Sequence, residues 1–149
     1  MKVEILCKSQ RILSELPKVD PRVRAILLDA AWFLAGRGYS LVVTCLLRTR
    51  KEQQEILARA MELSRKEPER SPHEFGRAAD IRTDGIPGNV IDELVEYLNR
   101  KYPYDNPNLK CAIRHDVGGG DHVHVQVGWR TASEWGIPAL RSLGEGGAA

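Results

Sequence analysis

Histidine and aspartate residues give this chain its most distinctive chemical pattern. The 149 residues include only four histidines, and three of them, His115, His122 and His124, fall within ten residues near the C-terminus. The fourth, His73, precedes Asp80 by seven residues. Catalytic zinc sites use three nitrogen or oxygen ligands from the protein, at about 2.0–2.2 Å, and keep one position open. The pattern therefore predicts a zinc site that contains His73, Asp80 and one further histidine.

The spacing between His73 and Asp80 requires a turn in the chain. On a straight helix, residues seven positions apart are separated by about 10 Å, too far to share one ion. Pro72 and Gly76 flank this stretch and favour a turn that brings His73 back beside Asp80.

The third ligand comes from the pair His122 and His124. Residues two apart on a strand point the same way, so the spacing alone does not choose between them. Zinc suits a mixture of nitrogen and oxygen ligands better than magnesium or calcium, which prefer oxygen alone.

The elements that must position these residues alternate between helices and strands. The last two strands are separated by a short glycine-rich turn, which favours an antiparallel hairpin. We predict an α+β fold in which helices pack on a central antiparallel sheet. Residues 1–142 are expected to form a single domain and residues 143–149 a flexible tail. Apolar periodicity predicts helices over 21–35, 49–65 and 90–98, and strands over 39–47, 77–83, 109–114 and 122–129.

Composition excludes several classes of protein. Hydrophobic residues make up 42% and charged residues 28% of the chain, as in soluble globular proteins. A net charge of +2 gives no argument for nucleic-acid binding, and no apolar run reaches the length of about 20 residues that a membrane span requires. The odd number of cysteines, Cys7, Cys45 and Cys111, favours buried reduced thiols over disulfides. The first residues lack the apolar run of a signal peptide, so we expect synthesis in the cytoplasm.

The segment around His73 resembles a known family of zinc peptidases. Residues 71–80, SPHEFGRAAD, match the pattern S-x-H-x-x-G-x-A-x-D at all five fixed positions. That family contains D-Ala-D-Ala carboxypeptidases and dipeptidases and the L-alanyl-D-glutamate endopeptidases of phage endolysins, and its fold is shared with the Hedgehog signalling domain. The resemblance covers roughly residues 41–127. It implies a Hedgehog/DD-peptidase-like fold and a zinc cofactor.

The same resemblance implies roles for individual residues. The family carries an acidic residue three places before its third ligand, which makes His124 the ligand here and Asp121 the catalytic acid/base. Residues 44–48, TCLLR, are similar to the family segment T-S-G-Y-R, in which the arginine lies near the scissile carbonyl; this implies that role for Arg48. Gln53 follows at the family's spacing, although Cys45, Leu46 and Leu47 replace the usual Ser-Gly-Tyr.

Two further residues, Ser71 and His122, complete the expected site. Ser71 is expected to form a hydrogen bond that supports a metal ligand without touching the metal itself. His122 is expected to line the cleft or to donate a hydrogen bond to the reaction intermediate. His115 is expected to be a turn residue of the hairpin without a role.

Together these features predict a zinc metallopeptidase that hydrolyses an amide bond in peptidoglycan stem peptides. It would be an endolysin-like L-Ala-D-Glu endopeptidase or a D-Ala-D-Ala carboxypeptidase, monomeric, without nucleic-acid partners and without membrane insertion. It would act at the cell wall, after release by a holin-type pore. Two alternatives remain open: a non-catalytic zinc-binding module of a phage or prophage apparatus, and a cytosolic enzyme acting on small D-amino-acid dipeptides.

Overall fold

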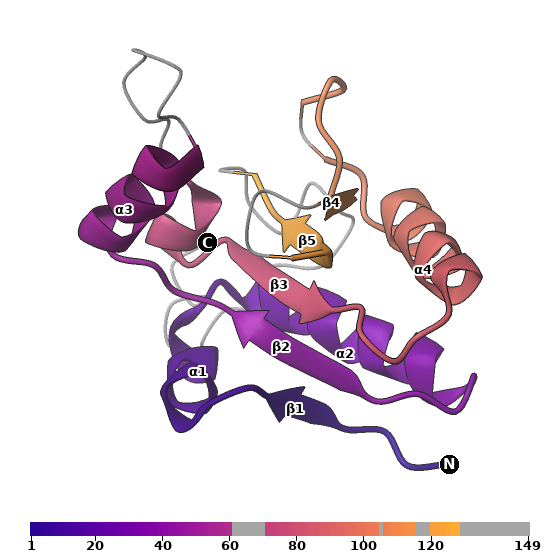
Figure 1. Cartoon of the computed structure of the whole chain (residues 1–149). Helices are drawn as coiled ribbons and strands as arrows, with labels where there is room; N and C mark the ends of the chain where they lie inside the picture. Colours follow the sequence, from indigo (N-terminus) through magenta and orange to yellow (C-terminus); the bar gives the residue numbers. More distant parts are fainter. Residues whose placement is uncertain (61–70, 105, 116–119, 129–149) are drawn as a thin grey trace, which may run out of the picture.

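A five-stranded mixed sheet with helices around it forms the body of the protein (Figure 1). The computed structural model describes residues 1–60, 71–104, 106–115 and 120–128. Within these ranges, no helix is long and apolar enough to cross a membrane. The elements in chain order are β1 (Ile5–Cys7), α1 (Gln10–Glu15), the 3-10 helix η1 (Leu16–Lys18), α2 (Pro21–Ala35), β2 (Leu41–Cys45), α3 (Arg50–Ala60), the 3-10 helix η2 (Pro72–Phe75), β3 (Ala78–Arg82), α4 (Gly88–Lys101), β4 (Ala112–His115) and β5 (His122–Gln126).

The strands lie in the order β1-β2-β3-β5-β4, so β3 is the central strand. The pairs β2·β3, β3·β5 and β4·β5 are antiparallel, and the predicted hairpin of the last two strands is confirmed. The central strands pair antiparallel as predicted, but the whole sheet is mixed, because at one edge β1 pairs with β2 in parallel. Parallel neighbours need a long crossover connection, and here α1, η1 and α2 provide it.

Helices α2 and α4 pack against one face of the sheet and bury the hydrophobic core there. Each strand contributes its alternate apolar residues to this face; Val43, Ile81, Val123 and Val125 are completely buried. The opposite face of β3 and β5 carries Asp80, His122 and His124 instead. We call this second surface the metal face.

The predicted helix over 21–35 is confirmed as α2, and its ends have clear causes. The Asp20 side chain accepts a hydrogen bond from the Arg22 N–H, and Pro21 occupies the first turn, where its missing N–H costs nothing. At the other end Gly36 is the C-cap.

The remaining predicted elements correspond to β2, α3, β3, α4, β4 and β5 with shifted ends. The sequence prediction did not include β1 and α1, which have three and six residues and are too short to show a periodic pattern. The last part of the predicted helix over 49–65, the end of the predicted domain and the tail over 143–149 lie outside the described residues.

Candidate metal centre

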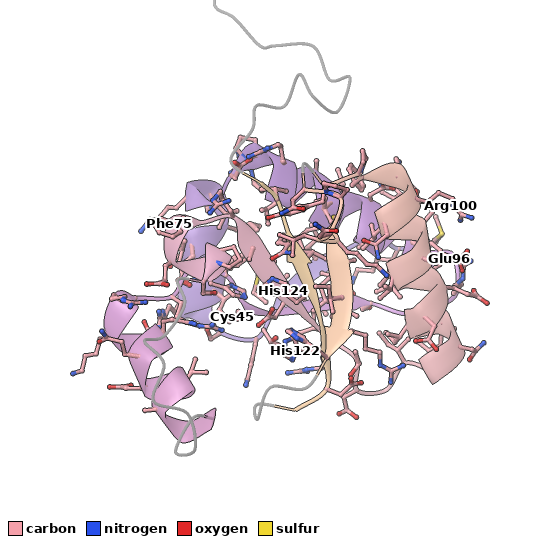
Figure 2. All side chains as sticks on the ribbon, turned by 90° about the horizontal axis from the view of Figure 1, so that it is seen from above. Cys45, Phe75, Glu96, Arg100, His122 and His124 are labelled. Atoms are coloured by element: carbon pink, nitrogen blue, oxygen red, sulfur yellow. The ribbon has the colours of Figure 1, made fainter. Side chains whose placement is uncertain are left out.

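Asp80 lies at the centre of the metal face, on the middle strand. In the strand register it stands directly opposite His124 of β5 and opposite Cys45 of β2. Residues directly opposite each other in an antiparallel pair share a face of the sheet. Asp80 is therefore flanked by a histidine on one side and a thiol on the other. Figure 2 labels these two neighbours, Cys45 and His124.

A register shift between β2 and β3 explains how Cys45 reaches this face. Val43 stands opposite Ile81 on the core side, and regular alternation would send Cys45 to that same side. The shift between Val43 and Cys45 pairs Cys45 with Asp80 instead. Bulges of this kind turn a side chain to the other face and are frequent beside active sites.

His73 is brought to the metal face by the short helix η2. The Ser71 hydroxyl accepts a hydrogen bond from the His73 N–H (3.3 Å), and the Glu74 carboxylate accepts one from the Ser71 N–H (2.6 Å). Gly76 ends the helix with φ of 68°, a left-handed conformation that glycine adopts without strain. The predicted turn between His73 and Asp80 is therefore a capped helical turn, and it leaves His73 only 2% exposed.

The hydrogen bonds of His73 decide which of its ring nitrogens faces Asp80. Its Nδ1 lies 2.8 Å from the carbonyl oxygen of Leu46, which can only accept, so Nδ1 carries a hydrogen. In the neutral ring, Nε2 then bears a lone pair, and Nε2 lies 3.1 Å from Asp80 Oδ1.

The same reasoning applies to His124, with Gln126 as the deciding partner. The Gln126 amide nitrogen donates to the Lys110 carbonyl (3.0 Å), so the Gln126 oxygen faces His124 Nε2 (3.1 Å) as an acceptor. His124 Nε2 therefore carries the hydrogen and Nδ1 the lone pair. That Nδ1 lies 3.0 Å from the same oxygen of Asp80, Oδ1.

Two ring nitrogens thus approach the same carboxylate oxygen, and electron pairs placed in this way repel one another unless a positive charge lies near them. Tetrahedral zinc with ligands at about 2.0–2.2 Å separates those ligands by about 3.3–3.6 Å. Asp80 Oδ1 lies 3.1 Å from His73 Nε2 and 3.0 Å from His124 Nδ1, within a few tenths of an ångström of this value. Each ring nitrogen therefore lies at a distance from Asp80 Oδ1 that is compatible with sharing a zinc ion with it. Cys45, His73 and Asp80 also form a group that could hold a metal ion, since their ligand atoms lie within 4.8 Å of one another.

The comparisons with known proteins identify no family for this chain. No family model matches it, and no curated protein or solved structure matches it at a significant level.

Without a metal, a proton supplies the positive charge at this point. Burial alone would lower the pKa of His73, but the hydrogen bond and charge of the Asp80 carboxylate outweigh it and raise that pKa to about 10. Burial would raise the pKa of Asp80, but the two histidines hold it well below its usual range. The metal-free protein therefore holds a protonated His73 against an ionised Asp80 at neutral pH.

Metal uptake should accordingly release a proton. A metal needs the lone pair of His73, so it competes with a proton that dissociates only near pH 10. Between pH 6.5 and 9 we expect the apparent zinc affinity to rise with pH, by up to about tenfold per unit. Calorimetry in buffers with different heats of ionisation measures the released proton directly. An affinity that stays constant over this range would contradict the assignment of His73.

Two of the residues predicted by resemblance lie next to these ligands. Arg48 Nη2 lies 4.0 Å from Asp80 Oδ2, and Arg48 Nη1 donates to the side-chain oxygen of Gln53 at 2.7 Å. Both side chains are largely buried, and the Arg48 backbone N–H donates to the His73 carbonyl. A guanidinium cation held in this way is suited to bind a carbonyl oxygen or a carboxylate of a substrate.

His122 and His115 extend the metal face toward the start of β5. His122 Nδ1 donates to the Gly120 carbonyl, and its Nε2 lies 3.7 Å from Asp80 Oδ1. The sequence prediction that His115 is a turn residue is wrong: it is the last residue of β4 and stands opposite His122, with ring centroids 4.6 Å apart. Burial and the neighbouring histidines lower the pKa of His115. Side chains alternate strictly along β5, and β4 pairs with it in a hairpin. The same alternation applied to β4 could have predicted that His115 shares a face with His122.

The structure places the carboxylate of Asp121 toward α4. It accepts hydrogen bonds from the guanidinium of Arg114 (3.1 and 3.2 Å) and from the hydroxyl of Thr83 (2.9 Å). These bonds lower the pKa of Asp121. Arg114 also donates a hydrogen bond to Asp92 of α4, so the Asp121 carboxylate and the Arg114 guanidinium lie on the side of the sheet that faces the helices. Asp121 precedes β5 by one residue, and strand alternation does not fix where its side chain points.

Sequence reasoning missed two residues of the site. Cys45 was expected to be a buried core thiol, as Cys111 is, but it is half-buried on the metal face. Its Sγ lies 3.7 Å from His73 Nδ1 and 3.6 Å from Arg48 Nη2. Gln126 was not considered, although its place two residues after His124 on the same strand face is visible in the sequence.

Replacing Gln126 tests the orientation of His124. Gln126→Leu keeps the size of the side chain but removes the acceptor that holds the hydrogen on His124 Nε2. Partners of this kind typically contribute about 10–100-fold to metal affinity, and we expect a loss of that size in zinc titrations. Gln126→Glu keeps an acceptor and should retain most of the affinity. Equal affinity in the leucine variant and the unmodified protein would contradict this role.

Proposed function

We propose that this protein is a zinc-dependent peptidase that cuts an amide bond in peptidoglycan stem peptides. The observation that carries the proposal is the convergence of the lone pairs of His73 Nε2 and His124 Nδ1 on Asp80 Oδ1. The carboxylate that these rings share is largely buried, so a cation there is held at a fixed point.

A zinc ion held by His73, Asp80 and His124 would polarise the substrate carbonyl and lower the pKa of a water molecule toward about 7. Residues of the chain would stabilise the developing charge and transfer the proton. Arg48, fixed by Gln53, would stabilise the negative charge that develops on the carbonyl oxygen. Asp121 would accept a proton from the attacking water and return it to the leaving amine, as the resemblance implies. Ser71 would hold the turn that carries His73.

The substrate class follows from the resemblance of residues 71–80, and of Asp121 and His124, to the family of peptidoglycan peptidases. Stem peptides contain D-amino acids and free carboxylates. The cation of Arg48, beside the metal ligands, is a suitable partner for such a carboxylate or for the scissile carbonyl. Both an endopeptidase and a carboxypeptidase would need these residues.

Digestion of purified peptidoglycan tests the proposal. The zinc-loaded protein is expected to release new peptide ends, identified by mass spectrometry of the muropeptides, and free D-alanine distinguishes carboxypeptidase from endopeptidase cleavage. A chelator should stop the reaction and added zinc restore it, whereas His73→Ala should remain inactive with zinc. Zinc-loaded protein that leaves both the muropeptides and free D-Ala-D-Ala intact would contradict the proposal.

One observation favours a second candidate, a non-catalytic zinc module that binds a partner. Cys45 lies close enough to His73 and Asp80 to join them in holding a metal. Sites with four protein ligands are typical of structural zinc, which supports folding and leaves no position open. This candidate predicts tight zinc binding, strong destabilisation by chelators and no turnover of either substrate.

A further inference from the structure

The thiol of Cys45 is the unexplained group of the metal face. The register shift of β2 places it opposite Asp80, on the other side of the carboxylate from His124. The hydrolytic ligand set does not use its sulfur, which lies 3.7 Å from His73 Nδ1, the ring nitrogen that also donates to the Leu46 carbonyl. The sulfur is half-buried and next to a cluster of metal ligands.

The position of the sulfur is compatible with a bond to the same metal. A zinc ion with a thiolate at about 2.3 Å and nitrogen ligands at about 2.0–2.1 Å separates sulfur from nitrogen by about 3.5 Å. The ligand atoms of Cys45, His73 and Asp80 lie within 4.8 Å of one another.

The charges around Cys45 also suit a metal-bound thiolate. Arg48 Nη2 lies 3.6 Å from the sulfur and 4.0 Å from Asp80 Oδ2, so a cation faces both negative groups. A thiolate is the form of cysteine that binds zinc. An anionic sulfur here would face a guanidinium as well as the metal.

We propose that Cys45 is an additional, displaceable ligand that closes the metal site in the resting protein. This proposal rests on the proposed function, since it concerns the position that hydrolysis needs. On binding, the thiol releases its proton to solvent and a metal–sulfur bond forms. When substrate enters, that bond breaks, the sulfur takes up a proton, and the position on the metal becomes free. The resting ligands are then Cys45, His73, Asp80 and His124.

Cobalt(II) spectroscopy on the full chain tests this directly, because thiolate-bound cobalt absorbs strongly in the near ultraviolet and any tetrahedral cobalt site absorbs in the visible. We expect both bands in the unmodified protein. Cys45→Ala should keep the visible bands and lose the near-ultraviolet band. Cys7→Ala is the matched control, a half-buried cysteine on β1, and should keep both.

The outcomes separate this inference from the proposed function. Visible bands without a near-ultraviolet band in the unmodified protein would overturn the role of Cys45 while leaving the metal site intact. A near-ultraviolet band that survives in Cys45→Ala and in Cys45→Ser would also overturn it. Absence of all bands would remove the metal site and the peptidase with it.

Two further measurements test whether the ligand is displaceable. Zinc should slow the alkylation of Cys45 by iodoacetamide at least tenfold and leave that of Cys7 unchanged, as read from labelled peptides. A saturating stem peptide should restore the reactivity of Cys45 in the zinc-loaded protein. Cys45→Ala should turn over substrate severalfold faster than the unmodified protein, because no sulfur has to leave the metal before substrate binds. Continued protection by zinc under saturating peptide would overturn the displacement.

Discussion

His124→Ala is expected to leave the protein unable to retain zinc, whereas His122→Ala is expected to retain it. His124 Nδ1 lies 3.0 Å from Asp80 Oδ1 and is held there by Gln126, while His122 Nε2 lies 3.7 Å from the same oxygen. Loss of a residue that hydrogen-bonds to a metal ligand typically lowers metal affinity by about 10–100-fold, so loss of the ligand itself should lower it more than about 100-fold. Zinc titration against a chromophoric chelator measures both variants.

The two histidines form a matched pair, because they lie on the same face of the same strand, two residues apart. Thermal unfolding of the metal-free variants provides the control for folding. If His122→Ala loses zinc and His124→Ala keeps it, the third ligand is His122 and the role assigned to Gln126 is wrong as well.

Asp121→Asn is expected to keep zinc and to lower turnover by about 10²–10⁴-fold, the usual contribution of a general acid/base. The amide has the shape of the carboxylate but cannot accept the proton of the attacking water. Hydrogen bonds from Arg114 and Thr83 lower the pKa of Asp121, so its carboxylate is ionised at neutral pH, as a base requires. To act on substrate the carboxylate must leave Arg114 and Thr83, which hold it on the helix side of the sheet.

Asp92→Asn is the matched control for this prediction. Asp92 binds the same guanidinium, that of Arg114, at 3.2 Å, so its loss perturbs the ion pair without touching the proposed base. We expect near-normal turnover in Asp92→Asn. A large loss in His122→Gln, together with a small one in Asp121→Asn, would move proton transfer to His122, which lies nearer to Asp80.

The sequence predicted the helices and strands that show a clear period, and it predicted that His73 and Asp80 lie together. Those two residues are close in the chain, and proline and glycine mark the turn between them. The spacing alone left His122 and His124 open and the resemblance favoured His124; that His124 stands opposite Asp80 depends on the register of β5 against β3, which is a long-range property. Hydrogen bonds to the Leu46 carbonyl and to the Gln126 side chain orient the rings of His73 and His124. The position of a backbone carbonyl cannot be predicted from residue types.

The position of Cys45 could not be predicted because it depends on a single-residue shift. Alternation along the apolar run of β2 assigns Cys45 to the core together with Val43. Such a shift moves every following side chain to the other face of a strand. Nothing in residues 41–45 marks where the shift occurs, since all of them suit a strand.

The central position of β3 has a consequence for how the protein opens. This strand has β1 and β2 on one side and β5 and β4 on the other, and an ion at Asp80 would join it to β5 and η2. Because an ion that binds only the closed form stabilises that form, any fluctuation that frees β3 must first expel the ion. Backbone amides of β3 should therefore exchange with deuterium far more slowly once zinc is present, while those of β1 at the sheet edge should show little change.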